Sequence, residues 1–239
     1  MKIVVTSFCG DVGKTTLTAN FLLPRLKPEI PSDCIFSFET LNGGLQEAGV
    51  KAHTVPADKF DEVLDAVMLS KAALVDVGQS NAEKFFEKMV QLDGSHEEFD
   101  CFLIPVVESS HAIEEAVRTV EALHVMGVPA KKIKIVFNKI DGINFDIESK
   151  FAEIVALHQL KKATVNTKAA IYKSPLFDEL KDTQLTLADV INDPINYRAD
   201  FNSVMGTDKQ AYYLVRIAMK RRSSQVTQNL DNVYAELRL

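Results

Sequence analysis

The 239-residue sequence has no tryptophan, only three cysteines and no long apolar run. A membrane-spanning helix needs roughly 20 consecutive apolar residues, and no segment approaches that length. The apolar run near the N-terminus is only as long as a strand, which is too short for a signal peptide. Cys9, Cys34 and Cys101 have neither a C-x-x-C pair nor the spacing of metal ligands. We therefore expect a cytoplasmic protein without a cysteine-based metal site.

The sequence also lacks an excess of positive charge. Its net charge of −6 argues against a protein that coats nucleic acid by charge alone, although a local basic contact with DNA stays open. A hydrophobic fraction of 46% and a charged fraction of 25% are typical of a soluble globular protein. The length accommodates one large domain, or a domain with a helical extension.

The first twenty residues have the order strand, loop, helix. Residues 3–5 are an apolar run typical of a buried strand, and a glycine-containing turn follows. Lys14 then opens the helical pattern of residues 15–26, which Pro24 and Pro28 are expected to end. Backbone N–H groups of such a turn point into one small volume, and the helix dipole favours an anion there. The segment therefore predicts a phosphate-binding loop.

Single residues of this loop have distinct expected roles. Gly13 lets the backbone approach a phosphate oxygen closely, Lys14 can reach the outer phosphates, and the Thr15 hydroxyl can ligate Mg²⁺. The common phosphate-binding pattern is G-x-x-x-x-G-K-[ST], and Phe8 stands at its first position here.

Residues 9–16 resemble the deviant Walker A motif, K-G-G-x-G-K-T-T, of the ParA/MinD family of P-loop ATPases. Residues 8–16 are more similar still to the F-x-G-x-V-G-K-T-T loop of StbB-type plasmid stability proteins. The resemblance implies ATP bound with Mg²⁺. The loop residues that it assigns to the nucleotide are Gly10, Asp11, Val12, Gly13, Lys14, Thr15 and Thr16.

Two positions depart from the family pattern. Cys9 replaces the signature lysine, which in the family reaches across a dimer to the partner's nucleotide. Asp11 replaces the second glycine and brings a carboxylate near the phosphates. We therefore expect slow ATP hydrolysis, with stimulation by a partner that supplies the missing positive charge.

Two acidic residues near the ends of predicted strands complete the expected site. Asp76 lies at the exit of the strand predicted over residues 72–78 and begins the D-x-G pattern of a Walker B strand and switch loop. We expect Asp76 to support Mg²⁺ and the Gly78 N–H to sense the γ-phosphate. Glu39 follows the strand predicted over residues 34–38 and precedes a glycine loop. The resemblance makes Glu39 a switch-region acid, whereas the residues alone also allow a solvated loop acid.

Asn138, Lys139, Ile140 and Asp141 follow the strand predicted over residues 133–137. N-K-x-D at this place is similar to the guanine motif of GTPases, in which the Asp accepts from the base. ParA/MinD relatives use an Asn here to contact adenine. Asn138 and Asp141 are therefore candidate base contacts, and a turn that spells this motif by chance stays open. We favour ATP because of the loop resemblance, with GTP as the alternative.

Strand and helix patterns alternate along the rest of the chain. Apolar runs predict further strands over residues 99–107 and 164–172 and an edge strand over residues 49–55. Helical periodicity marks residues 58–70, 81–92, 108–126 and 148–160. This order predicts a doubly wound α/β fold, with a mainly parallel sheet of the P-loop NTPase type and helices on both faces. We expect this domain at residues 1–180 and a C-terminal helical extension, packed on it, at residues 181–239.

The extension is expected to begin with polar connections around Asp193 and to continue as a helix from about residue 208. The apolar side of that helix should pack on the sheet domain. It comprises Ala211, Leu214, Val215, Ala218 and Met219. A basic segment, residues 220–222, follows. The alternatives to packing on the sheet domain are a partner-binding or dimer helix, or a contact with DNA or anionic lipid.

Three functions stay open from the sequence. The resemblance implies a nucleotide-switched plasmid stability or partition protein, which forms a nucleotide-dependent homodimer and acts through a DNA-binding partner protein from the same operon. The N-K-x-D motif favours an enzyme instead, a SIMIBI-type GTPase or a kinase. The absent lysine at Cys9 favours a nucleotide-binding scaffold with little hydrolysis. If phosphoryl transfer occurs, Lys14, Glu39 and Asp76 are the residues expected to act in it, by position and charge.

Overall fold

A seven-stranded sheet forms the centre of the computed structural model, which describes residues 1–26, 29–39 and 44–239. Its strands all pair in parallel, in the order β3-β2-β4-β1-β5-β6-β7. They are β1 (Lys2–Val5), β2 (Ile35–Phe38), β3 (His53–Thr54), β4 (Ala73–Val77), β5 (Cys101–Val106), β6 (Ile133–Ile140) and β7 (Ala170–Tyr172). The predicted doubly wound, parallel α/β fold is confirmed, with β3 as the expected edge strand.

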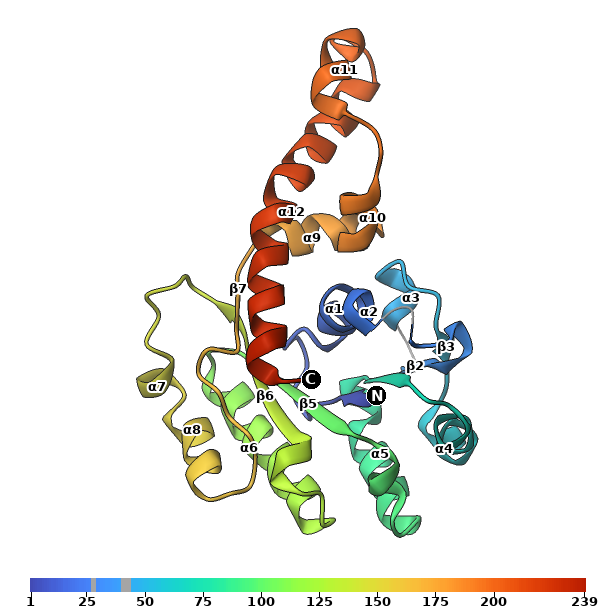
Figure 1. The fold of residues 1–239 in the computed structure, drawn as a ribbon, viewed down its shortest axis with the longest axis vertical. Helices are drawn as coiled ribbons and strands as arrows, with labels where there is room; N and C mark the ends of the chain where they lie inside the picture. The colour runs from blue at the N-terminus through green and yellow to red at the C-terminus, as the bar shows by residue number, and fades with distance from the viewer. Residues whose placement is uncertain (27–28, 40–43) are drawn as a thin grey trace.

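Helices cover both faces of this sheet (Figure 1). One face carries α4 (Phe60–Leu69), α5 (Gln79–Gln91), α6 (Ser110–Val125) and α8 (Ala152–Gln159). The other carries α1 (Lys14–Leu17), the π-helical turn η1 (Thr18–Leu22), α2 (Leu23–Leu26) and α12 (Lys209–Leu237). The remaining helices are α3 (Gly44–Glu47), α7 (Ile147–Lys150), α9 (Pro175–Thr183), α10 (Leu187–Asn192) and α11 (Tyr197–Val204). Within the described ranges, every helix is too short or too polar to cross a membrane.

The central strand β1 marks the point where the chain changes direction across the sheet. Elements before β5 extend the sheet on the β4 side of β1, and β5, β6 and β7 extend it on the other side. In open α/β sheets, ligands bind at the carboxyl ends of the strands beside such a point. The apolar residues of β1, such as Ile3, Val4 and Val5, are fully buried. The core therefore anchors the carboxyl end of this central strand.

The first helix ends at Leu26 as predicted, but Pro24 lies inside it and does not end it. Pro24 has no N–H, and in a regular α-helix its ring would clash with the carbonyl four residues earlier. The π-helical turn η1 lies directly before it, and the N–H of Leu23 bonds to the carbonyl of Thr18. This wider turn lets residues 14–26 run as one helical segment, which we call the loop helix.

Two strands also differ from the sequence-based expectation. β6 extends to Ile140, so the first part of the N-K-x-D motif lies inside a strand rather than after it. β7 is confined to residues 170–172, and the segment before it forms only an isolated bridge between Thr164 and Lys134. The glycine loop predicted after Glu39 lies mostly outside the described residues.

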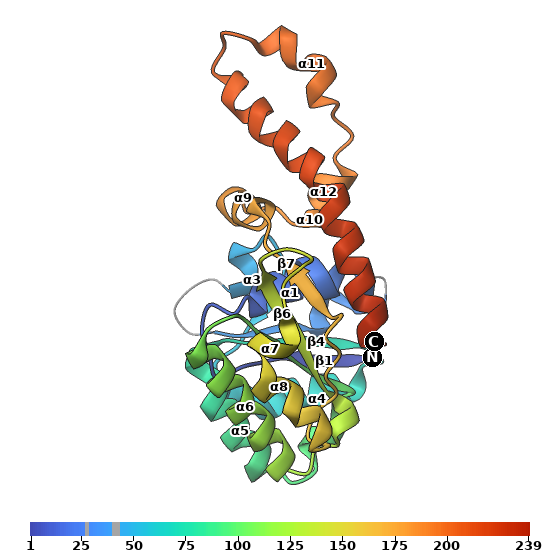
Figure 2. The ribbon, with the colours of Figure 1, turned by 90° about the vertical axis from the view of Figure 1, so that its left-hand side faces the viewer.

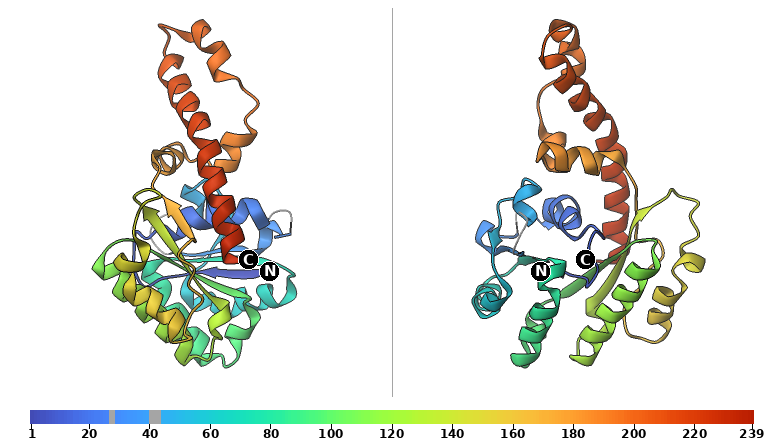
Figure 3. Two further views of the ribbon diagram at one scale, coloured as in Figure 1. Left: turned by 60° about the vertical axis from the view of Figure 1, so that its left-hand side comes forward. Right: turned by 180° about the vertical axis from the view of Figure 1, so that it is seen from behind.

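The polar connections predicted around Asp193 are replaced by two short helices, α10 and α11. Each begins at a capping side chain: Thr186 and Asp189 form a capping box at α10, and Asn196 accepts from the Ala199 N–H at α11. The antiparallel pair formed by α11 and the first half of α12, residues 193–220, projects from the body and is called the arm (Figure 2). From the tip of the arm, α12 runs back to the sheet (Figure 3).

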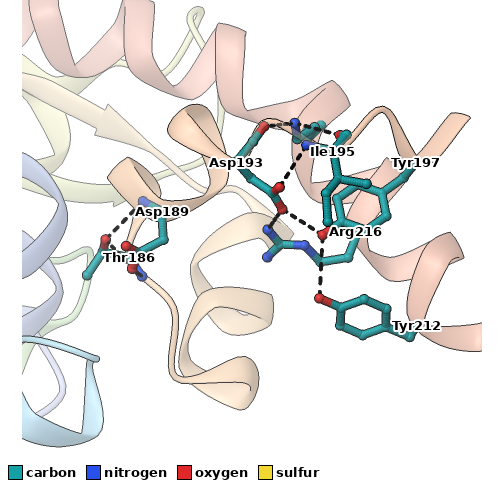
Figure 4. A network of polar contacts seen from close by, with 8 residues as sticks. Thr186, Asp189, Asp193, Ile195, Tyr197, Tyr212 and Arg216 are labelled. Atoms are coloured by element: carbon teal, nitrogen blue, oxygen red, sulfur yellow. Dashed lines mark hydrogen bonds and ion pairs between the residues drawn. The ribbon is translucent and has the colours of Figure 1, made fainter. Parts of the chain in front are cut away.

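A buried ion pair joins the two helices of the arm. Arg216 of α12 is almost fully buried and donates to the Asp193 carboxylate (Figure 4). That carboxylate also accepts from the Tyr197 hydroxyl at 2.6 Å and from the Ile195 N–H at 3.0 Å. A buried ion pair requires such additional hydrogen bonds because both charges lose their water.

Most of the predicted apolar side of α12 does not pack on the sheet domain. Ala211, Leu214 and Val215 are exposed, whereas Met219, from the same predicted set, is buried in the core, and Arg216 and Ile217 are buried as well. The physical reason is that α11 pairs with the Arg216 side of α12, and this part of α12 lies beyond the sheet (Figure 2).

The loop helix is attached to the C-terminal segment by three residues. The Asn20 side chain accepts from the Leu187 N–H, in the first turn of α10, at 2.7 Å. Arg25 donates to Asp231 of α12 at 2.6 Å, and the rings of Phe21 and Tyr234 lie 6.1 Å apart. The helix that follows the predicted phosphate loop is therefore part of the base of the arm.

One side chain of α12 closes the outer edge of β7. The bonds from the Phe137 N–H to Ala169 and from the Lys173 N–H to Ile140 lie on the β6 side, so the backbone groups of residues 170 and 172 face outward. Asn229 donates to the Ala170 carbonyl at 2.9 Å and accepts from the Tyr172 N–H at 3.1 Å. The amide thus takes the place of a further strand.

Replacement of this amide should destabilise the fold. We expect Asn229→Ala to lower the free energy of unfolding by about 1–3 kcal/mol, because it leaves a strand N–H and a carbonyl without their partner. Urea denaturation measures the effect. Asn232→Ala, at an exposed position of the same helix, is the matched control and should change little. Equal losses in the two variants would contradict the edge-closing role.

Candidate nucleotide-binding site

The predicted phosphate loop connects β1 to α1 and requires glycine at its last position. Gly13 has a φ of 87°, a left-handed conformation, and directly precedes Lys14. A Cβ atom there would lie 2.4 Å from Nδ2 of Asn138. No side chain caps the first N–H groups of α1, which therefore face the loop. These donors are the ones an anionic phosphate needs.

The Phe8 position, where the common pattern has glycine, anchors the loop to the helices beneath it. Its φ is not left-handed, so glycine is not required. The Phe8 N–H donates to the Thr119 hydroxyl at 3.1 Å, and its ring lies 5.0 Å from that of Phe86. The Arg118 guanidinium lies 4.8 Å from the ring centroid. Packing against α5 and α6 thus replaces a tight glycine turn.

The other departures from the family pattern also have structural reasons. Cys9 is buried in a small apolar cluster with Val12 and Ala112, so its side chain supports the loop from below. Asp11 adopts a left-handed φ of 55°, which Asp tolerates better than most residues, and it is exposed. Its carboxylate therefore has access to water.

Lys14 is buried and lies across its own loop. Its ammonium donates to the Cys9 carbonyl at 2.6 Å. Burial lowers the pKa of Lys14, and the nearby Asp76 carboxylate opposes that shift. The arrangement places a positive charge at the centre of the loop.

Asp76 is buried and joins the loop helix to β4. The strand register puts Asp76 beside Val5, the last residue of β1, at the level where the loop begins. Its carboxylate accepts from the Thr15 hydroxyl at 2.8 Å and from the Thr18 hydroxyl at 3.3 Å. Burial raises the pKa of Asp76 to about 6, even though the Thr15 hydrogen bond and the Lys14 charge lower it.

Thr15 and Asp76 fit the requirements of Mg²⁺. Both offer oxygen atoms, and Mg²⁺ in nucleotide sites is bound through one or two protein oxygens, substrate phosphates and water. In residues 1–26, 29–39 and 44–239 no three His, Cys, Asp or Glu side chains are grouped to hold a metal ion. A nucleotide-linked Mg²⁺ needs no such cage, so the donor set agrees with the predicted ion.

Glu39 and Gly78 lie side by side at the ends of β2 and β4. A Cβ atom on Gly78 would lie 2.2 Å from Oε2 of Glu39, so a larger residue there would displace the Glu39 carboxylate. Glu39 accepts from the Ser80 hydroxyl at 3.0 Å. The Gly78 N–H donates to the Phe38 carbonyl at 2.9 Å. Phosphate sensing by this N–H, which stays a prediction, requires that bond to break.

The N-K-x-D motif meets the loop through its first two residues. The buried Asn138 amide donates to the Val12 carbonyl at 2.8 Å, and the Lys139 ammonium donates to the Asp11 carbonyl at 2.8 Å. Lys139 has a left-handed φ of 56°. Asp141 lies at the surface, with a side chain 60% exposed, and pairs with Lys173 at 2.8 Å.

The structure thus gathers most of the predicted residues around one loop. Gly10, Asp11, Val12, Gly13, Lys14 and Thr15 form the loop and the start of α1, with Thr16 half-buried in its first turn. Asp76 and Asn138 contact them directly. Sequence reasoning missed Thr18 and Lys139. The spacing of Thr18 three residues after Thr15 was an available signal, because such residues share a helix face.

A glycine loop between the first strand of a parallel sheet and a helix, with a buried lysine and a strand-end Asp, defines a P-loop nucleotide-binding architecture. Comparisons with models of protein families and with curated proteins found no match. Solved structures of MinD and McdA proteins share the fold.

Three of these structures illustrate the likeness. MinD in the MinC:MinD cell division protein complex of Aquifex aeolicus is 16% identical, with a TM-score of 0.54, 94% of this chain covered and 96% of that one. The septum site-determining protein MinD of Pyrococcus horikoshii, complexed with Mg-ADP, is 13% identical, with a TM-score of 0.52 and coverages of 91% and 93%. Apo McdA of Cyanothece is 14% identical, with a TM-score of 0.50 and coverages of 96% and 98%. The chain therefore has the ParA/MinD-type fold predicted from its loop.

The buried carboxylate should lower the stability of the protein without ligand. Because the folded state raises the pKa of Asp76 above its ordinary value of 3.8, the stability associated with this group is present at low pH. It is lost as the pH rises through about 6. Asp76→Asn should therefore stabilise the ligand-free protein at pH 7.5 by about 2–3 kcal/mol, and this gain should shrink toward pH 4.

Urea denaturation at several pH values, without Mg²⁺ or nucleotide, measures this difference. Asp65→Asn, an identical change at an exposed position of α4, is the control and should show no such pH-dependent gain. A destabilised Asp76→Asn protein at pH 7.5 would contradict the inferred cost of the buried charge.

Proposed function

We propose that the chain is a Mg²⁺-dependent, ATP-binding switch that acts in plasmid stability or partition. The observation that carries the nucleotide part is the 2.8 Å hydrogen bond between Thr15 and Asp76, next to the buried Lys14. Lys14 would hold the outer phosphates, and Thr15 and Asp76 would hold Mg²⁺. The ion supplies charge neutralisation for phosphoryl transfer. Glu39 and Gly78 would register the γ-phosphate.

Slow turnover follows from the charges that the loop offers. The buried Cys9 brings no cation to the phosphates, and Lys139 is bonded to the Asp11 carbonyl. Lys14 is then the residue of the loop that brings positive charge to the phosphates. Since phosphoryl transfer depends on neutralising charge, we infer that a second protein accelerates hydrolysis.

The plasmid role rests on the loop resemblance to StbB-type and ParA/MinD proteins. We propose a nucleotide-dependent homodimer in the cytoplasm that acts through a DNA-binding partner protein encoded in the same operon. A protein with this fold is known in complex with a protein partner, MinD with MinC. Such a partner would couple the nucleotide state to DNA, which the net charge of −6 does not favour as a direct ligand.

Loss of Lys14 should abolish nucleotide binding. Calorimetric titration with a slowly hydrolysed ATP analogue and Mg²⁺ should show binding to the unchanged protein and none to Lys14→Ala, because the ammonium opposes the phosphate charge. Lys131→Ala, at an exposed lysine outside the site, is the matched control.

Unchanged affinity in Lys14→Ala would contradict the site. In cells, the same two variants test the plasmid role separately. A plasmid retained equally well with Lys14→Ala and Lys131→Ala, although only the first has lost its nucleotide, would contradict that role and leave the nucleotide site intact.

GTP binding is the second candidate, and the contacts of Asn138 and Lys139 with the loop favour it. These bonds place the N-K-x-D segment beside the phosphate site. The exposed Asp141 carboxylate can accept two hydrogen bonds. Guanine presents two adjacent donors, N1–H and its 2-amino group, whereas adenine does not.

The two bases are separated by titration of ATP and GTP analogues in parallel with Asp141→Asn. We expect the ATP analogue to bind more tightly and Asp141→Asn to leave that affinity unchanged. Asp182→Asn, an identical change at an exposed position of α9, controls for the lost charge. Preferential GTP-analogue binding that disappears in Asp141→Asn, and not in Asp182→Asn, would overturn the choice of ATP.

A further inference from the structure

The outer side of α12 in the arm carries an apolar stripe, of which three residues are exposed in the described part of the chain and the fourth, Ala218, is half-buried. We define the stripe as Ala211, Leu214, Val215 and Ala218. Their spacing of i, i+3, i+4 and i+7 puts them on one face of the helix. Leu214 is 50% and Val215 40% exposed. The side of α12 that holds the Arg216 ion pair is the one facing α11.

Exposed apolar side chains are concentrated in the arm. Five of the twelve large hydrophobic residues that are exposed within the described ranges belong to residues 193–220. They are Ile195, Met205, Tyr212, Leu214 and Val215. Grouped apolar exposure on an element that projects from the body is typical of an interaction site (Figures 1 and 2).

We propose that the stripe is a self-association surface, on which a second copy of this chain packs its own α12 in antiparallel orientation. The side chains favour a helix as the occupant. Ala211 and Ala218 flank the larger Leu214 and Val215, so another helix can approach closely at the alanines and fill the space between them. A membrane-binding face would instead present large apolar residues along its whole length.

The charges at the ends of the stripe select a copy of the same helix. Asp208 precedes the stripe, and the exposed Arg221 follows it, whereas Arg222 is already paired with Glu179 of α9. Antiparallel pairing brings the acidic end of each copy to the basic end of the other and aligns the helix dipoles favourably. Parallel pairing would bring like charges together. Lys209 lies on the opposite side of the helix, since each residue advances by about 100°.

The size of the stripe sets the strength of this association. A standard interface buries about 800 Å² on each partner, more than four side chains, two of them alanine, provide. The dimer is therefore weak and reversible. Its two-fold symmetry closes it at two copies. The stripe contains none of the residues assigned to the nucleotide, so the pairing is expected without bound nucleotide.

Sedimentation velocity of the full chain without nucleotide, over a wide concentration range, tests the surface. The dimer fraction should rise with concentration, and Val215→Asp should raise the dissociation constant by at least about tenfold because it buries a charge in the contact. Val125→Asp is the matched control: Val125 is 84% exposed on α6, outside the arm. Circular dichroism and calorimetry with the ATP analogue check that both variants fold.

Cysteine substitutions test the orientation. The two-fold axis of the proposed pair passes near Leu214 and Val215, so Leu214→Cys should form a disulfide with its own copy when an oxidant is added. Ala211→Cys should join only to Ala218→Cys in a mixture of the two proteins. The native cysteines are buried and do not compete.

Several results would overturn the proposal. A chain that stays monomeric at every concentration, or one whose dimer is weakened equally by Val125→Asp, has no such surface. Self-linkage of Ala211→Cys would indicate parallel helices. A monomer that binds vesicles containing anionic lipid, and loses them in Val215→Asp, would assign the stripe to a membrane.

Discussion

The buried carboxylate of Asp76 is the interaction on which the rest of the site depends. It accepts hydrogen bonds from the hydroxyl groups of Thr15 and Thr18, in the first and second turns of the loop helix. These bonds fix that helix against β4. The charged form of this group is unfavourable in such a dry position, which is why its pKa rises. A cation bound beside Asp76 would favour the charged carboxylate and so lower its pKa. The fold therefore keeps a buried carboxylate at the site whose charged form a bound cation would stabilise.

Much of the fold could be predicted because its signals are local and strong. Buried parallel strands are continuous apolar runs, so β1, β4 and β5 could be found without any tertiary information. The loop could be placed for the same reason, since Gly13 and Lys14 stand between such a strand and a helix. Parallel order then brings the ends of β1 and β4 together, and Asp76 follows from that topology.

What could not be predicted depends on contacts between distant segments. Pro24 reads as a helix end unless a π-helical turn precedes it, and no residue pattern marks that turn. The stripe of α12 reads as a packed face, but the buried Arg216 shows that the helix turns its charged side inward to meet Asp193. Short helices such as α10 and α11 owe their existence to caps and to these tertiary bonds, because isolated helices of that length are unstable. Lys139 was missed because its bond to Asp11 spans 128 positions of the chain.

The attachment of the loop helix to the C-terminal segment gives the molecule the mechanics of a lever. Asn20 holds the root of α10, and Arg25 holds α12, both within three helical turns of Lys14. A small rotation of the loop helix about its own axis would be transmitted through these contacts to the arm. The displacement grows with distance from the pivot, so the tip moves most. The farthest part of the protein is then its most sensitive reporter of what occupies the loop.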